Sequence, residues 1–121
     1  MRRSRLNRAL HAPQKDDAME IGITVWSGAA APTEQTLRLL MQEQGLRPYA
    51  WGNGPFDQYA PHSHEYDKVI YVVSGGVTFG LPQEGRTFEL RAGDRLDLPA
   101  GTVHDAVVGD GGVVCLEAHT G

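Results

Sequence analysis

The sequence predicts an all-β protein, a small antiparallel β-barrel or jelly roll with one short amphipathic helix before the barrel. From residue 46 onward, short apolar and β-branched segments alternate with turns that contain glycine or proline. Glycine makes up 15 of the 121 residues, which is above its usual share of about 7%. Many short strands at this spacing are typical of a sandwich or a barrel, and the length leaves room for one hydrophobic core.

One segment before the barrel, residues 33–44, has the pattern of a helix. Thr33 is suited to cap its N-terminus, and Gly45 is suited to end it. Three apolar residues between them are spaced so that they share one face: Leu37, Leu40 and Met41. We therefore expect an amphipathic helix that packs on the outside of the barrel.

Nine segments have the composition of strands, rich in β-branched and aromatic residues. The first, Ile21–Trp26, precedes the helix. The other eight follow it: Arg47–Trp51, Phe56–Ala60, Lys68–Val73, Gly76–Leu81, Thr87–Leu90, Arg95–Leu98, Val103–Val108 and Gly112–Ala118. The turns between them include 74–76 and 109–112, which are rich in glycine.

Charge is distributed unevenly along the chain. The first 15 residues hold five basic and no acidic residues, whereas the rest holds six basic against 15 acidic residues. An acidic body lacks the basic face that phosphate contacts need, so we expect no nucleic-acid partner. We expect residues 1–18 to form a basic, disordered N-terminal arm and residues 19–121 to form one β-barrel domain. An Arg-rich targeting peptide and a true start at Met19 are the alternatives for the arm.

Several classes of protein are excluded by simple features. Cys115 is the single cysteine, so an internal disulfide and a multi-cysteine metal site are ruled out; we expect it to be a buried small hydrophobe. No apolar run approaches the roughly 20 residues that span a bilayer. No apolar segment of a secretory signal follows the N-terminal arginines. We therefore expect no membrane partner and a cytoplasmic location.

Three histidines are the main candidates for chemistry. His62 and His64 are one residue apart, so on a strand both side chains point to the same side. His104, on a later strand, can supply a third imidazole from across the barrel. An isolated His-x-His is more often a surface pair, but three convergent imidazoles predict a site for a divalent transition metal (Zn, Fe, Ni, Mn or Cu) with positions left open for water or substrate.

The two segments that hold these histidines resemble the two motifs of the cupin superfamily, G-x5-H-x-H-x3,4-E-x6-G and G-x5-P-x-G-x2-H-x3-N. The first segment has Pro61 before the histidines, the His-x-His itself and Gly75 at its end. The second matches at four positions: Gly93, Pro99, Gly101 and His104. The resemblance spans about residues 54–108 and implies a small single-domain cupin, a fold whose members commonly form homodimers by adding an N-terminal strand to the partner's sheet. Ile21–Trp26 is the candidate for that strand, so we expect a homodimer.

Two positions depart from the motifs: the glutamate is replaced by Lys68 and the closing asparagine by Val108. The alternation of side chains places Lys68 and Gln58 on the side of His62, so both are candidates for substrate binding. For Gln58, a glutamine at a strand edge without a role in binding is the favoured alternative. A divalent ion about 5 Å from the Lys68 ammonium is repelled by roughly 6–7 kcal/mol at an effective dielectric of about 20. This repulsion leaves three alternatives. Metal binding is weakened or lost, or Lys68 gives up its proton and acts as a neutral ligand or base. In the third alternative, a bound anion lies between the Lys68 ammonium and the metal ion.

A fourth alternative is that Lys68 turns to solvent or pairs with Glu65 or Asp67. The functional hypotheses follow from these alternatives. The first is a metal-dependent enzyme of oxygenase, isomerase or lyase type, acting on a small molecule that is anionic if Lys68 binds it. The second is a non-catalytic module that binds a small ligand with weak or no metal. The third is a metal-free enzyme in which Lys68 and a histidine carry out acid–base catalysis.

The remaining aromatic and histidine side chains are given no chemical role by the sequence. We expect the aromatic residues to fill the core or an interface: Tyr59, Tyr66, Tyr71, Phe79 and Phe88. His11 and His119 lie near the termini, and neither is assigned to the site.

Overall fold

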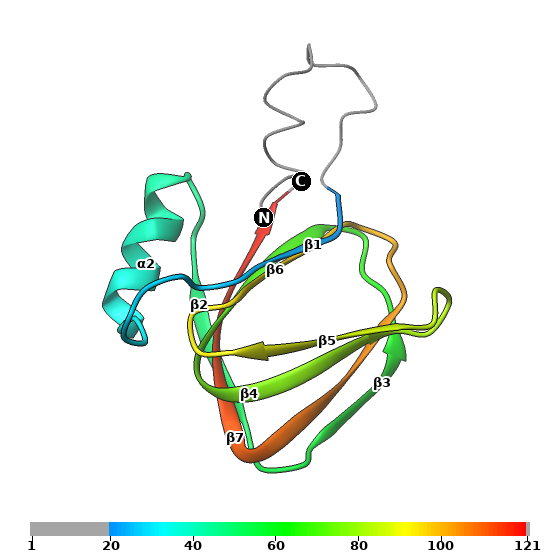
Figure 1. The fold of residues 1–121 in the computed structure, drawn as a ribbon. Helices are drawn as coiled ribbons and strands as arrows, with labels where there is room; N and C mark the ends of the chain where they lie inside the picture. The colour runs from blue at the N-terminus through cyan, green and yellow to red at the C-terminus, as the bar shows by residue number, and fades with distance from the viewer. Residues whose placement is uncertain (1–19, 121) are drawn as a thin grey trace.

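The structure, a computed structural model that describes residues 20–120, is an antiparallel β-barrel with one helix beside it (Figure 1). Its elements are β1 (Gly22–Thr24), α2 (Glu34–Glu43), β2 (Tyr49–Asn53), β3 (Gln58–His62), β4 (Asp67–Leu81), β5 (Arg86–Arg91), β6 (Arg95–Leu98) and β7 (His104–Thr120). The strands pair in the order β1-β6-β4-β7-β2, while β3 also pairs with β7 and β5 with β4. The predicted fold class is therefore confirmed. The expected arm, residues 1–18, lies outside the described residues.

The two longest strands correct the prediction of turns at 74–76 and 109–112. β4 and β7 each run through one of these segments without interruption and stay paired with each other on both sides of it. The pairing register shifts there, near Ser74 and Gly75. Gly75 and Gly112 both have φ near +76° (77° and 75°), a conformation that glycine adopts without strain. The glycines therefore bend the two strands around the barrel instead of ending them.

The helix forms as predicted. The Thr33 hydroxyl caps its N-terminus by accepting a hydrogen bond from the backbone N–H of Thr36 at 3.1 Å. Gly45 follows the C-cap with φ 79°. Leu37 and Met41 are fully buried on the outer face of β4 and β7. They pack there with four buried residues of these strands: Val69, Tyr71, Leu116 and Ala118.

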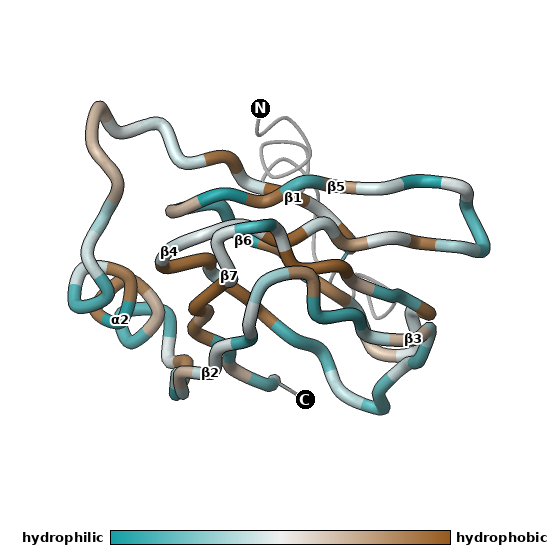
Figure 2. Tube along the Cα trace, turned by 90° about the horizontal axis from the view of Figure 1, so that it is seen from below, coloured by the Kyte–Doolittle hydropathy of each residue, from teal (hydrophilic) through white to brown (hydrophobic). Residues whose placement is uncertain are grey.

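A second core fills the inside of the barrel, and Figure 2 shows apolar stretches of β4, β6 and β7 gathered in the middle of the molecule with α2 beside them. Along β4, Ile70 and Val72 face the interior core, whereas Val69 and Tyr71 face the helix. This strand is buried on both faces, which explains its continuous apolar run. Lys68 of β4 lines the interior cavity. At this residue the apolar run of β4 gives way to a charged side chain, and the candidate site begins there.

The first strand is shorter than expected. β1 covers part of the predicted Ile21–Trp26 and pairs with β6 of its own chain, Ile23 opposite Leu96. β1 is the first strand in the order of the sheet, and its addition to a partner's sheet and a homodimer both stay predictions.

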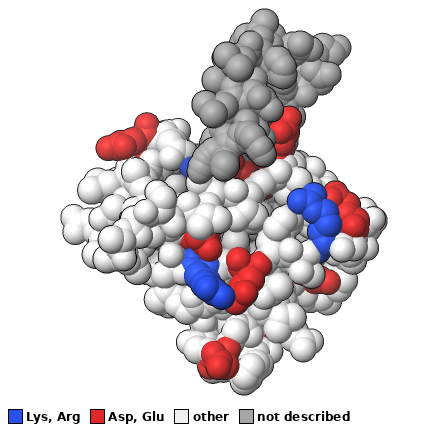
Figure 3. Space-filling model, viewed as in Figure 1, with Lys and Arg blue, Asp and Glu red and all other residues white. Residues whose placement is uncertain are grey.

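On the face shown in Figure 3, some acidic side chains adjoin basic ones and others stand apart from them. On β5 and the turn before it, Arg86 lies 3.1 Å from Glu84 and Arg91 lies 3.6 Å from Glu89. Exposed pairs of this kind contribute little to stability. Within residues 20–120, no helix has the length and apolar composition needed to cross a membrane.

Candidate metal centre

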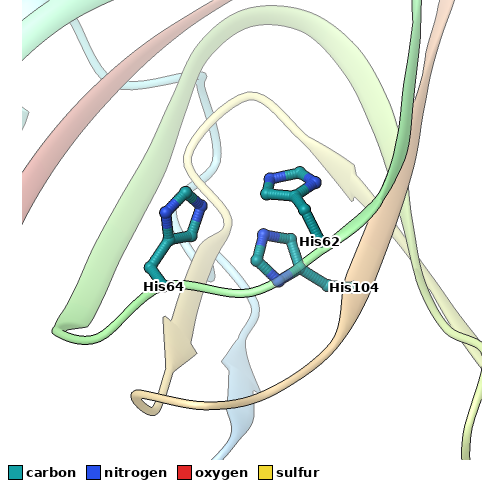
Figure 4. Close-up of side chains that lie close together, drawn as sticks. All are labelled: His62, His64 and His104. Atoms are coloured by element: carbon teal, nitrogen blue, oxygen red, sulfur yellow. The ribbon is translucent and has the colours of Figure 1, made fainter.

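The three predicted histidines meet at one end of the barrel interior. His62 closes β3 and lies opposite His104, the first residue of β7, while His64 follows in the connection to β4. One ring nitrogen from each lies within 4.8 Å of the other two. The ring of His62 has its centroid 4.3 Å from that of His104 and 4.9 Å from that of His64. Figure 4 shows the three rings facing a common space.

Backbone carbonyls fix the orientation of two of the rings. His62 donates a hydrogen bond from Nδ1 to the Ala60 carbonyl oxygen at 2.6 Å, and His104 donates from Nδ1 to that of Thr102 at 2.9 Å. A carbonyl only accepts, so the proton of each neutral ring is on Nδ1 and the lone pair is on Nε2. Second-sphere bonds of this kind hold metal-binding imidazoles in their ligating tautomer.

His64 carries the unsatisfied atom of the site. Its Nε2 is buried and has no hydrogen-bond partner among the described residues, which is unusual for a buried polar group. Burial lowers the pKa of His64, helped by the charge of Lys68, and burial likewise lowers the pKa of His104. Both rings are therefore neutral at neutral pH, the form that binds metal.

These residues fit a divalent transition metal. Two nitrogens that each lie about 2.1 Å from one ion in a tetrahedral site are about 3.4 Å apart. Because the ring nitrogens lie within 4.8 Å of each other, side-chain rotations must bring the widest pair closer by up to about 1.4 Å. Three imidazoles, one of them with a buried nitrogen that has no hydrogen-bond partner among the described residues, are a donor set suited to such an ion.

The ring of His64 contacts the hydroxyl of Tyr66, whereas the other two histidines bond to backbone carbonyls. Its hydroxyl lies 3.2 Å from His64 Nδ1, and metal binding through Nε2 requires Nδ1–H to donate to that oxygen. We expect Tyr66→Phe to weaken zinc affinity about tenfold, the lower end of the usual second-sphere effect, measured by competition with a chromophoric chelator. Unchanged affinity would show that this contact does not orient the ring.

Lys68 lies inside the barrel, and its partner is a residue that the sequence analysis did not select. The ammonium is 3.4 Å from Oε2 of Glu117, and these side chains are 11% and 6% exposed. Lys68 therefore turns neither to solvent nor to Glu65 or Asp67; the Asp67 carboxylate accepts from the Ala100 N–H at 2.8 Å. The sequence does contain a signal for this partner, because Glu117 is a charged residue within the apolar run near the end of β7.

Both oxygens of the Glu117 carboxylate accept hydrogen bonds. Oε1 accepts from the Trp51 indole at 2.9 Å, and Oε2 accepts from the Tyr49 hydroxyl at 2.8 Å and contacts His119 Nε2 at 2.6 Å. Burial raises the pKa of Glu117, but the His119 hydrogen bond, the Lys68 charge and the other two donors outweigh it, so the pKa lies below its usual value. Glu117 is thus held as an anion beside Lys68, and His119 is part of the cavity wall's hydrogen-bond network.

The histidines, Lys68 and Glu117 line one cavity of about 360 Å³, within the size range of small-molecule sites. Gln58 is exposed and is not among the lining residues, whereas Tyr59 is. The reason is a register shift between Tyr59 and His62 in β3. This bulge reverses the alternation, so the prediction that Gln58 shares the side of His62 is wrong and Tyr59 takes its place.

Two other predictions about side chains have clear outcomes. Cys115 is fully buried in the interior core, and burial raises the pKa of its thiol to about 12, as expected of a small hydrophobe. Tyr71 and Phe79 are buried in the cores as predicted. Tyr59 and Tyr66 line the cavity instead.

Comparisons with known proteins agree with this geometry. The family model of the cupin domain matches residues 54–119. No curated protein matches the chain. Among solved structures, an RmlC-like cupin from Shewanella frigidimarina is 24% identical with a TM-score of 0.53, and the match covers 61% of this chain and 64% of that one. This level of identity supports the fold alone.

Two enzymes are also similar to the chain. A polyketide cyclase from Streptomyces resistomycificus is 30% identical over 61% of this chain and 54% of its own, with a TM-score of 0.53. A structure of DMSP lyases is 27% identical over 64% of this chain and 40% of its own, with a TM-score of 0.58. The chain thus spans about half of the length of these enzymes. Because the family model covers more than half of its residues, the chain belongs to the cupin family.

Proposed function

We propose that this cupin binds one divalent transition metal through His62, His64 and His104 and acts on a small molecule in the adjoining cavity. The observation that carries the proposal is the buried, unpartnered Nε2 of His64 beside two imidazoles whose Nδ1 atoms are already bonded. Three protein ligands leave coordination positions for a substrate. A bound ion supplies a Lewis acid at that end of the cavity.

The residues of this chain have separate tasks in the proposal. The backbone carbonyls of Ala60 and Thr102 hold two imidazoles in the ligating tautomer. The aromatic side chains of Trp51 and Tyr59 line the cavity and limit the water around the ligand. Lyase, isomerase or oxygenase chemistry is consistent with such a centre, and the similar DMSP lyases and polyketide cyclase support chemistry on a small organic molecule.

The test is metal binding by protein purified without a histidine tag. We expect one zinc or nickel ion per chain by calorimetry, and an affinity at least tenfold lower in His104→Ala. Glu89→Ala, which removes a potential ligand on the exposed strand β5, is the control and should bind as the wild type does. Equal binding by His104→Ala and the wild type would contradict the proposal.

A further inference from the structure

Among the residues that the structure describes, Lys68 is the one lysine or arginine that lines the cavity. It is 8% exposed, and within residues 20–120 its one polar contact is Glu117 Oε2 at 3.4 Å. That oxygen already contacts the Tyr49 hydroxyl at 2.8 Å and His119 at 2.6 Å. An ammonium has three N–H donors, so Lys68 has donors left for a ligand in the cavity.

The same ammonium shares its cavity with the candidate metal centre, because Lys68 and the three histidines all belong to the lining. With Glu117 ionised, the lysine and glutamate charges cancel, so a bound divalent ion leaves the cavity with an uncompensated charge of about +2. A ligand that enters is favoured if it carries negative charge.

Part of the lining is apolar. Besides the polar groups and the tyrosine and tryptophan side chains, the cavity is lined by Ile70, Val77, Phe79, Ala106 and Val108. These side chains offer no hydrogen bonds, so the part of a ligand that reaches them must be hydrocarbon-like. The volume of about 360 Å³ lies at the small end of ligand sites.

We infer that the cavity binds the carboxylate of a small organic acid between Lys68 and the three-histidine centre, with Glu117 positioning the lysine and the acid's short apolar body against Ile70, Phe79 and Val108. The inference rests on the proposed metal centre and specifies its substrate class.

A carboxylate fits these groups better than an inorganic dianion does. Phosphate and sulfate sites are usually built from several cations or from backbone N–H groups at a helix N-terminus. Here one ammonium lies beside an ionised carboxylate, Glu117, which repels a second negative charge. The apolar wall also favours a ligand that has both an anionic and a hydrocarbon part.

The experiment is titration of zinc-loaded protein with butyrate, with butyramide as the neutral analogue of equal size and with sulfate as the inorganic anion. We expect butyrate to bind at least tenfold more tightly than butyramide and sulfate. Lys68→Met should reduce butyrate affinity at least tenfold and leave butyramide affinity unchanged. Arg86→Met, which removes one exposed positive charge on β5, is the matched control and should bind butyrate as the wild type does.

Lys68→Met leaves the Glu117 carboxylate without its cation, so a second variant guards against misfolding. The double variant Lys68→Met, Glu117→Gln keeps the cavity neutral and should also bind butyrate at least tenfold more weakly than the wild type does, while a smaller preference for butyrate over butyramide remains through the zinc charge. If the wild type binds zinc but Lys68→Met binds butyrate equally well, or if sulfate equals butyrate, the subsite is overturned while the metal centre stands. If the wild type binds no zinc, the proposed function fails and the subsite fails with it.

Discussion

Replacing Glu117 with glutamine is expected to destabilise the protein by about 3–5 kcal/mol, the usual cost of leaving one member of a buried ion pair without its partner. Lys68 and Glu117 are both buried, and the ammonium has its one polar contact within residues 20–120 on this carboxylate. Glutamine keeps the shape and the possibility of bonding to Trp51, so the loss reports the charge. Urea unfolding at pH 7 measures it.

Metal binding should respond to the same substitution. Without the Glu117 charge, the Lys68 ammonium repels a divalent ion with less compensation, and we expect zinc affinity to fall at least tenfold, or about 1.4 kcal/mol. The double variant Lys68→Met, Glu117→Gln removes both charges and should recover most of the stability and of the zinc affinity, because a neutral pair is often as stable as a buried ion pair. If the double variant lost as much stability and as much zinc affinity as Glu117→Gln does, this result would contradict the pairing of Lys68 with Glu117.

Gly75→Ala is expected to cost about 3–5 kcal/mol, since it combines the strain of a left-handed residue with overpacking. Gly75 has φ 77°, and a Cβ there would overlap the carbonyl oxygen of Gly112 on the neighbouring strand. The bend of β4 cannot relax without moving β7, because the two strands are paired on both sides of it. Thermal or urea unfolding measures the loss.

Gly85→Ala is the matched control for this prediction. Gly85 also has positive φ, 64°, but a Cβ there has no neighbour within 4 Å. Its cost should be about 1–2 kcal/mol, which is the conformational part alone. If both variants lose the same stability, the overlap of the added Cβ with Gly112 does not contribute to the cost of Gly75→Ala.

Acid should unfold the wild type partly through Glu117. Its pKa in the folded protein lies below the ordinary value of 4.5, so the unfolded chain takes up the proton first and stability falls as the pH drops below about 4.5. Above that pH the stabilisation is fully present. The double variant Lys68→Met, Glu117→Gln lacks the carboxylate and should lose less stability between pH 5 and pH 3 in urea unfolding, whereas equal losses would contradict the assignment.

Much of the fold was predictable because the local signals agree with the global structure. The apolar spacing of Leu37 and Met41 gave the helix and its buried face. The spacing of His62, His64 and His104 within two glycine-bounded segments gave the convergence of the three rings. The prediction that the glycines near 75 and 112 form turns between strands was wrong, because composition does not distinguish a glycine that ends a strand from one that bends it.

The parts of the site that were missed depend on long-range pairing. Lys68 and Glu117 are 49 positions apart and meet because β4 and β7 pair with Ile70 opposite Glu117, a register that the sequence alone does not give. Tyr59 rather than Gln58 lines the cavity because of a bulge in β3. One extra residue in a strand reverses the side on which every later side chain lies.

The continuity of β4 and β7 also bears on how the cavity fluctuates. His104 and Glu117 are on the same strand, and Lys68 is on the strand hydrogen-bonded to it. Opening one end of the cavity would break backbone hydrogen bonds that also hold the barrel core, so such openings have nearly the free energy of global unfolding. The cavity wall that β4 and β7 form is thus preformed, and under the proposed function we expect it to select molecules by how well they fit this space rather than by closure of the barrel around them.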